Sequence, residues 1–270
     1  LWLGYLNGFS RFDPEKKLFH HFISGNNGTP QTGEVTSFTQ TNDGAIWAAT
    51  ERSGLLKINP DDKTIRQIEH SPHKENSILS GALYRLATDA KGRIWIAFKD
   101  SGVSRFDPIN GSTTNFTHDT SDPTSISSNK TTDVFRDLDG NVWIATFEGL
   151  NLFLEEKEKF IRYTQNNSNI QENLIISVYQ TRERKYWIGT MSGLASGMKT
   201  DFQKYDQSQG NLSHNSVNAF AETRDGSLWV ATDDGLNRLY PEAEQFTWIN
   251  EATKPALSQP RVMSLFDDND

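Results

Sequence analysis

The sequence predicts an all-β fold made of six repeats of about 45 residues, each repeat folding into four short strands. Six of the seven tryptophans recur at intervals of 45, 48, 48, 44 and 42 residues, at Trp2, Trp47, Trp95, Trp143, Trp187 and Trp229. A glycine followed by an apolar residue stands six or seven residues after each of these tryptophans. Segments rich in Val, Ile, Thr and aromatic residues alternate with tight turns, and no window has helical periodicity. Four strands in a repeat of this length are typical of a β-propeller blade.

The second repeat shows how each element is predicted. Residues 35–40, VTSFTQ, alternate apolar and polar side chains, which is the pattern of a half-buried strand. An Asn-Asp-Gly turn at 42–44 then allows a tight hairpin, because glycine accepts a positive φ without a Cβ clash. The second, third and fourth strands follow at 46–50, 55–60 and 64–69. The fifth repeat departs from this pattern, because Arg184 stands where other repeats carry the turn glycine.

The repeated tryptophans are predicted to pack between neighbouring blades. A large aromatic residue at the same position of every second strand suits a sheet–sheet interface better than a ligand site. Trp248 is different, because it lies in an outer strand whose apolar positions are Phe246 and Ile249. Trp248 should therefore face outward, where its side chain is a candidate contact for a partner domain.

The two ends of the chain lead to a prediction about closure. We expect residues 1–270 to form a single β-propeller domain, excised from a longer protein because the chain begins without Met. Its first residues, Leu1–Gly4, read as a second strand, and residues 262–266 read as a first strand. We expect 262–266 to join the three N-terminal strands in a three-plus-one clasp that closes six blades and leaves no exposed edge. The alternative is part of a seven-bladed ring that lacks one blade.

Composition excludes several classes of function. The 27 basic and 35 acidic residues give a net charge of -8 without a run of Lys or Arg, so no nucleic-acid partner is expected. No stretch reaches the ~18 apolar residues of a membrane span, so we expect no direct membrane insertion of this segment. There is no Cys to form a disulfide or a thiolate metal site. The Asp-rich turns lack further calcium ligands, and His20 and His21 point to opposite strand faces, so we expect no metal and no cofactor.

Ligand contacts are predicted at the sheet edge where loops differ between repeats, which we call the loop face. It holds the loops between second and third strands and the connections between blades, and variable loops on a rigid scaffold are where binding residues concentrate. The candidate ligand-binding residues are Tyr5, Arg52, Lys99, Phe147, Glu148, Met191, Lys130, Asn173, Asn215 and Arg261. Such aromatic, charged and amide groups suit a small polar or saccharide ligand. No constellation among them specifies a reaction, so no catalytic residue is expected.

Several residue types recur at fixed distances from the repeated tryptophan. Examples are the segments DLDGNVWIATFEGLNLF at 137–153, DAKGRIWIAFKDSGVSRFDP at 89–108 and NLSHNSVNAF at 211–220. This pattern resembles the two-component regulator propeller repeat. The resemblance implies a non-catalytic sensor propeller of a bacterial two-component or cyclic-di-nucleotide signalling protein. It also implies a periplasmic location, as the extracytoplasmic part of an inner-membrane protein.

The resemblance leaves two questions open about partners and activity. The partner is either the small polar or saccharide ligand or an adjacent propeller or linker domain of the same protein. The alternative function is a propeller enzyme, a lyase or hydrolase that uses the loop face, because streptogramin lyases carry distantly similar repeats.

Overall fold

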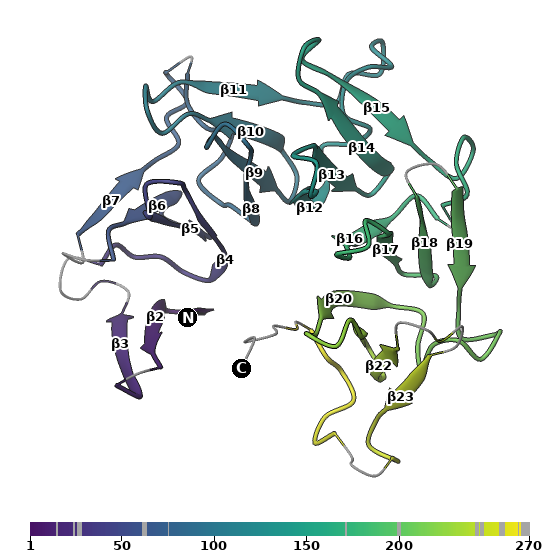
Figure 1. Ribbon diagram of the computed structural model, residues 1–270. Helices are drawn as coiled ribbons and strands as arrows, with labels where there is room; N and C mark the ends of the chain where they lie inside the picture. The colour runs from purple at the N-terminus through teal and green to yellow at the C-terminus, as the bar shows by residue number, and fades with distance from the viewer. Residues whose placement is uncertain are drawn as a thin grey trace. The chain divides into compact units, whose positions relative to one another are not determined.

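The folded chain consists of strands, turns and loops. The computed structural model describes residues 1–14, 16–23, 25, 29–60, 64–74, 76–170, 172–198, 201–240, 243, 246–253, 257–263 and 265. These residues form 23 strands and no helix, which confirms the predicted all-β class. The strands are grouped into six sheets, and within each sheet neighbouring strands follow one another in chain order (Figure 1).

The chain divides into two compact units. Unit 1 consists of Leu1–Arg136 and Gly140–Ile144, and unit 2 of Asp137–Asp139 and Ala145–Asp270. The first sheet has three strands, β1 (Trp2–Tyr5), β2 (Gly8–Asp13) and β3 (Leu18–Ile23). The second sheet is formed by β4 (Val35–Gln40), β5 (Ile46–Thr50), β6 (Leu55–Ile58) and β7 (Ile65–Ile68). The third is formed by β8 (Arg85–Thr88), β9 (Ile94–Phe98), β10 (Gly102–Phe106) and β11 (Thr113–Phe116).

The remaining three sheets also have four strands each. The fourth contains the boundary between the units and is formed by β12 (Thr131–Arg136), β13 (Val142–Thr146), β14 (Gly149–Leu154) and β15 (Lys159–Tyr163). The fifth is formed by β16 (Ile175–Gln180), β17 (Tyr186–Thr190), β18 (Leu194–Met198) and β19 (Asp201–Tyr205). The sixth is formed by β20 (Val217–Glu222), β21 (Leu228–Thr232), β22 (Gly235–Leu239) and β23 (Thr247–Ile249).

The predicted strand order within a repeat is confirmed, and the tryptophan phrases mark the second strands. β5, β9, β13, β17 and β21 each contain one repeated tryptophan, and all five are five residues long. In the second sheet every neighbouring pair is antiparallel, with β4 paired to β5, β5 to β6 and β6 to β7. The predicted single domain over 1–270 stays a prediction.

The predicted burial of the tryptophans is confirmed for four of the six repeats, and contact with the next sheet is confirmed for Trp47 and Trp187. Trp47, Trp95, Trp143 and Trp187 are at most 2% exposed, whereas Trp2 and Trp229 are half-buried. Trp47 lies against Phe106 of the third sheet, with ring centroids 5.8 Å apart. In unit 2, Trp187 meets Phe246 of the sixth sheet at 6.0 Å. Trp248 is 40% exposed, as its strand register predicts.

The predicted clasp lies largely beyond the described residues. Ser264 and Phe266 are outside the described part of the chain, and Val262 is not part of a strand. The Val262 N–H donates to the Thr232 carbonyl at 3.0 Å, which joins it to the end of β21 within unit 2. The three-plus-one closure and its seven-bladed alternative therefore stay predictions.

The turn between first and second strands contains a left-handed residue in the second to sixth repeats. Gly44, Gly92, Gly140 and Gly226 have φ between 78° and 86° at this position. Arg184 takes the same place in the fifth repeat with φ of 67°, a conformation that is costly for a residue with a Cβ. The departure seen in the sequence is therefore a strained turn in the structure.

Candidate functional site

The loops between second and third strands are fixed by a repeated threonine. The buried residues Thr50, Thr146, Thr190 and Thr232 end their strands and donate their hydroxyls to the carbonyls of Gly54, Gly149, Gly193 and Gly235, at 2.8–2.9 Å. Each hydroxyl also accepts an N–H from within its loop. The threonine thus closes the loop at its base and leaves the middle residues to face outward.

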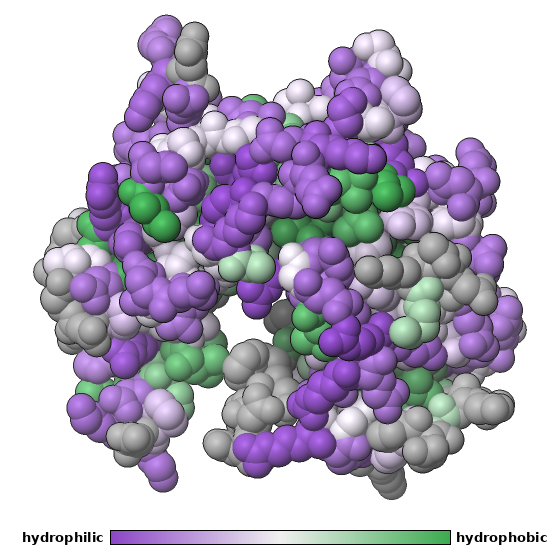
Figure 2. Space-filling view, turned by 45° about the horizontal axis from the view of Figure 1, so that its top comes forward, coloured by the Kyte–Doolittle hydropathy of each residue, from purple (hydrophilic) through white to green (hydrophobic). Residues whose placement is uncertain are grey.

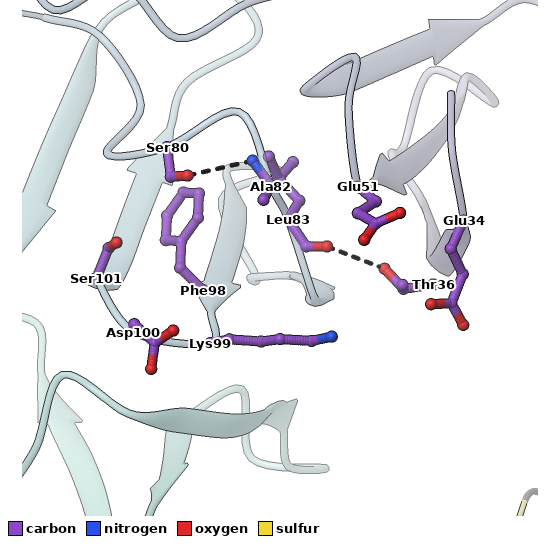
Figure 3. Close-up of a pocket in the computed structure, with 10 residues that line it drawn as sticks. All are labelled: Glu34, Thr36, Glu51, Ser80, Ala82, Leu83, Phe98, Lys99, Asp100 and Ser101. Carbon is purple, nitrogen blue, oxygen red and sulfur yellow. Dashed lines mark hydrogen bonds between the residues drawn. The ribbon is translucent and has the colours of Figure 1, made fainter. Parts of the chain in front are cut away.

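Unit 1 has a cavity of about 160 Å³ at the loop face, between the second and third sheets. Figure 3 shows its lining residues, which come from β4 and the segment before it, the β5–β6 loop, the segment before β8, the end of β9 and the β9–β10 loop. They are Glu34, Thr36, Glu51, Ser80, Ala82, Leu83, Phe98, Lys99, Asp100 and Ser101. A cavity of this volume holds a sugar-sized group rather than a drug-sized molecule.

A bulge in β4 shapes one wall of this cavity. The β4–β5 register shifts between Val35 and Ser37, so Thr36 is the extra residue. Bulges redirect a side chain, and here the Thr36 hydroxyl donates to the Leu83 carbonyl at 3.2 Å (Figure 3). The bulge therefore ties the first strand of one sheet to the chain entering the next sheet.

The two glutamates of the cavity are held together by the backbone. The Glu51 N–H donates to the Glu34 carbonyl at 2.9 Å, so the β5–β6 loop lies beside the segment before β4. Gly33 makes this approach possible: its φ is +63°, and a Cβ there would lie 2.9 Å from Cγ of Arg52. A side chain at 33 would push the loop outward.

The cavity is rich in carboxylates. Glu34, Glu51 and Asp100 are exposed acidic residues, and Lys99 is the basic residue of the lining. In Figure 3 the Lys99 side chain extends across the open side toward the strand that carries Thr36, and its ammonium lies 5.2 Å from the Tyr84 ring centroid. Carboxylates accept hydrogen bonds only, so this arrangement favours a ligand that presents hydroxyl or amine donors. The face of the molecule seen in Figure 2 is mostly hydrophilic, interrupted by smaller hydrophobic areas.

Unit 2 repeats the bulge with a different polar residue. The β20–β21 register shifts between Val217 and Ala219, which makes Asn218 the extra residue. Its amide donates to the Val262 carbonyl at 2.9 Å and to the Asp233 carboxylate at 3.0 Å. Arg261 Nε also donates to Asp233, at 2.9 Å. Hydrogen bonds from Asn218, then Ser216 and Arg261, outweigh desolvation and hold the pKa of Asp233 below its usual value.

Four of the predicted ligand residues lie in or beside these two places. Lys99 lines the unit 1 cavity, whereas Arg52 lies beside it with its stem against Gly33. Arg261 belongs to the Asp233 cluster of unit 2. Met191 reaches the same cluster, because the Ser216 hydroxyl contacts its sulfur at 3.6 Å.

The other predicted ligand residues either form hydrogen bonds within their own loop or sheet or are exposed away from these two places. The amide oxygens of Asn173 and Asn215 accept the N–H groups of Gln165 and Gln207, at 2.8 and 2.7 Å, so each closes a connection between sheets. The Tyr5 hydroxyl contacts the Phe9 carbonyl and Ser10 within the first sheet. Phe147, Glu148 and Lys130 are exposed. A ligand role for any of these residues stays a prediction.

The predicted residue set omitted the bulge residues Thr36 and Asn218. The available signal is a shared position: each directly follows the valine that starts its first strand. An alternating pattern does not reveal an inserted residue, because the apolar residues on either side still look regular. In the described part of the chain, no three His, Cys, Asp or Glu side chains are placed to hold a metal ion.

Solved structures identify the fold class as a β-propeller. The β-propeller domain of a Myceliophteria thermophila protein matches with a TM-score of 0.66 at 11% identity, over 90% of this chain and 80% of that one. Virginiamycin B lyase from Staphylococcus aureus matches at 0.68 and 12% identity, over 90% and 77%. Identities this low show the fold alone, so the lyase or hydrolase alternative stays a prediction.

The repeat within this fold is more specific. Residues 211–234 match the family model of the two component regulator propeller, which confirms the resemblance for this part of the sixth repeat. The extracellular domain of a putative hybrid two component system from B. thetaiotaomicron matches with a TM-score of 0.76 at 20% identity, over 96% of this chain. This chain spans about a third of that structure, 34% of its length. No curated protein sequence matches the chain.

Proposed function

We propose that this propeller is the non-catalytic sensor part of a bacterial two-component or cyclic-di-nucleotide signalling protein. The repeat matched at 211–234 and the fold shared with a hybrid two component system support a role in signalling. An extracytoplasmic, periplasmic position follows from the same likeness. No helix in the described part of the chain is long and apolar enough to cross a membrane.

The unit 1 cavity is the observation that supports a saccharide as the class of ligand. Its acidic lining and its volume suit one ring of a neutral or amino saccharide, whose hydroxyl and amine groups donate to Glu34, Glu51 and Asp100. Lys99 closes the open side and donates to a ring or hydroxyl oxygen. An adjacent propeller or linker domain is the competing occupant of this face, and it would contact the rim rather than fill the cavity.

A sugar panel tests this proposal. Thermal melting is measured with neutral, amino and uronic monosaccharides and disaccharides, and each stabilising sugar is then titrated by calorimetry. We expect neutral or amino sugars to stabilise the chain and uronic sugars to have no effect, because their carboxylates are repelled by the lining. Glu51→Gln and Lys99→Ala should each weaken binding about tenfold or more, the loss expected for one charged hydrogen bond.

Lys157→Ala is the matched control, because it removes a lysine charge from an exposed turn between β14 and β15. It should leave binding unchanged. Unchanged binding in Glu51→Gln and Lys99→Ala would refute this cavity as the site. A panel without any stabilising sugar would refute the saccharide class.

A further inference from the structure

In the second, third and sixth sheets a cation stacks on the repeated tryptophan. The cation comes from the third strand and lies directly opposite the tryptophan of the second strand. The pairs are Lys57 over Trp47 at 5.4 Å, Arg105 over Trp95 at 5.8 Å and Arg238 over Trp229 at 4.9 Å from the ring centroids. A cation over an indole face is attracted by the ring and covers it from solvent.

The fifth sheet lacks this cation. Ser196 is the residue opposite Trp187 across β17 and β18, in the register that places Lys57 opposite Trp47. The next residue is Gly197, where the second and third sheets carry Ile58 and Phe106. These two small residues leave a cavity of about 280 Å³, which we call the fifth-sheet pocket, lined by Lys185, Ser196, Gly197, Met198, Phe202 and Gln203.

The pocket contains a buried hydroxyl without a partner. Ser196 is 1% exposed, and its Oγ makes no hydrogen bond in the structure. An unpaired buried hydroxyl destabilises the folded state, so a ligand oxygen that bonds with it would remove that penalty.

Trp187 has lost its usual acceptor as well. Trp47 donates its indole N–H to the Thr41 hydroxyl at 3.0 Å, which is possible because that hydroxyl itself donates to Asp43. In the fifth repeat the Thr181 hydroxyl donates to the Lys185 carbonyl, as that of Thr41 also does to Ala45, but Glu183 stands at the position of Asp43 and the Trp187 N–H has no acceptor. The Trp187 indole N–H is therefore a second buried donor of the fifth sheet that has no partner.

Lys185 supplies a positive charge at the pocket. Its ammonium lies 4.7 Å from the centroid of the Trp187 ring, and burial lowers its pKa, partly opposed by the nearby Glu183. In the described part of the chain no carboxylate forms an ion pair with Lys185, whereas Lys57 pairs with Asp43 at 3.1 Å. A half-buried ammonium that forms no ion pair among the described residues attracts an anion.

We propose that the fifth-sheet pocket binds a small organic carboxylate. The Lys185 ammonium and the Ser196 hydroxyl donate to the carboxylate oxygens, and Met198 and Phe202 contact a short carbon chain. Three features favour this class: the donors outnumber the acceptors, the charge is positive, and part of the lining is apolar. The site lies wholly in unit 2 and is independent of the saccharide cavity proposed above.

The test is a titration of the ¹⁵N-labelled chain with propionate. NMR monitors the chemical shifts of the Ser196 backbone amide and of the Trp187 indole N–H. We expect saturable shifts of both signals below about 100 mM propionate, because millimolar affinity is what a few contacts provide. Ser196→Arg restores the cation of the other repeats and fills the pocket, so it should weaken binding about tenfold or more. Lys185→Gln removes the charge without filling the pocket and should also weaken binding.

Lys57→Arg is the matched control, because it places an arginine at the same register position of a sheet that has no such pocket. It should leave the propionate titration unchanged. Retained binding in both Ser196→Arg and Lys185→Gln, or the absence of saturable shifts with the unmodified chain, would overturn the proposal. Sulfate shifts as strong as those of propionate would overturn the assignment to a carboxylate.

Discussion

Replacing Trp47 with alanine tests how the sheets of this protein are held together. The Trp47 side chain is 2% exposed, packs against Phe106 of the next sheet and donates its N–H to Thr41. Truncating a buried tryptophan costs about 3–5 kcal/mol, because the cavity that remains cannot collapse fully. The lost hydrogen bond to Thr41 adds about 0.5–1.5 kcal/mol. We therefore expect Trp47→Ala to lower the free energy of unfolding by about 3.5–6.5 kcal/mol.

Urea unfolding followed by circular dichroism measures this loss, and Trp248 provides a control within the same chain. Trp248 is 40% exposed, so Trp248→Ala should cost less than about 1 kcal/mol. Trp47→Phe keeps most of the packing and loses the hydrogen bond, whereas Trp187→Phe removes an N–H that has no acceptor. The Trp47→Phe loss should exceed the Trp187→Phe loss by about 1 kcal/mol. Equal losses for Trp47→Ala and Trp248→Ala would refute the packing argument.

Three further predictions concern single positions. Arg184→Gly should raise the free energy of unfolding, measured in urea, by about 0.5–1 kcal/mol. The left-handed backbone of Arg184 costs more free energy than its exposed ion pair with Asp139 contributes. A lower free energy of unfolding in Arg184→Gly would show that the turn is not strained. Gly33→Ala should lower the free energy of unfolding by about 1 kcal/mol or more. Gly111→Ala should lower it by less, because a Cβ at 111 meets no atom within 4 Å. A larger loss for Gly111→Ala would refute the close contact between residue 33 and Arg52. The Thr223 hydroxyl is the main cause that lowers the pKa of Asp225 to about 2, so its stabilising effect is present above the unfolded value of 3.8 and is lost as pH falls toward 2. A carboxyl NMR titration should show this midpoint rising in Thr223→Ala, and an unchanged midpoint would exclude that hydrogen bond as the cause.

The repeat was predictable from the sequence because its signals are local. A tryptophan phrase and a glycine at a fixed offset set the second and third strands, and the turn glycines set the hairpin before them. Arg184 was recognisable as a departure for the same reason, since glycine adopts a positive φ more readily than any residue with a Cβ. The exposure of Trp248 followed from the two-residue period of its strand.

The candidate site was less predictable because it depends on contacts between repeats. Thr36 and Asn218 act through bulges, and an inserted residue leaves the alternating pattern nearly intact. Asn215 was assigned to the ligand from its position before a strand, whereas its amide oxygen closes its own connection. The fifth-sheet pocket required comparison of Ser196 with the cations of other repeats, together with the knowledge that those cations stack on tryptophan.

The threonine at the base of the loop between second and third strands closes that loop whichever residues lie inside it. Thr50 spans three intervening residues, whereas Thr146, Thr190 and Thr232 span two, and the hydrogen bond to the glycine carbonyl is the same in all four. Residues between these anchor points can be exchanged, or extended by one, at little cost to the scaffold. A lineage that carries this fold can therefore acquire new recognition by altering a few exposed positions. A library of variants confined to those positions would vary ligand binding while keeping the residues that stabilise the fold unchanged.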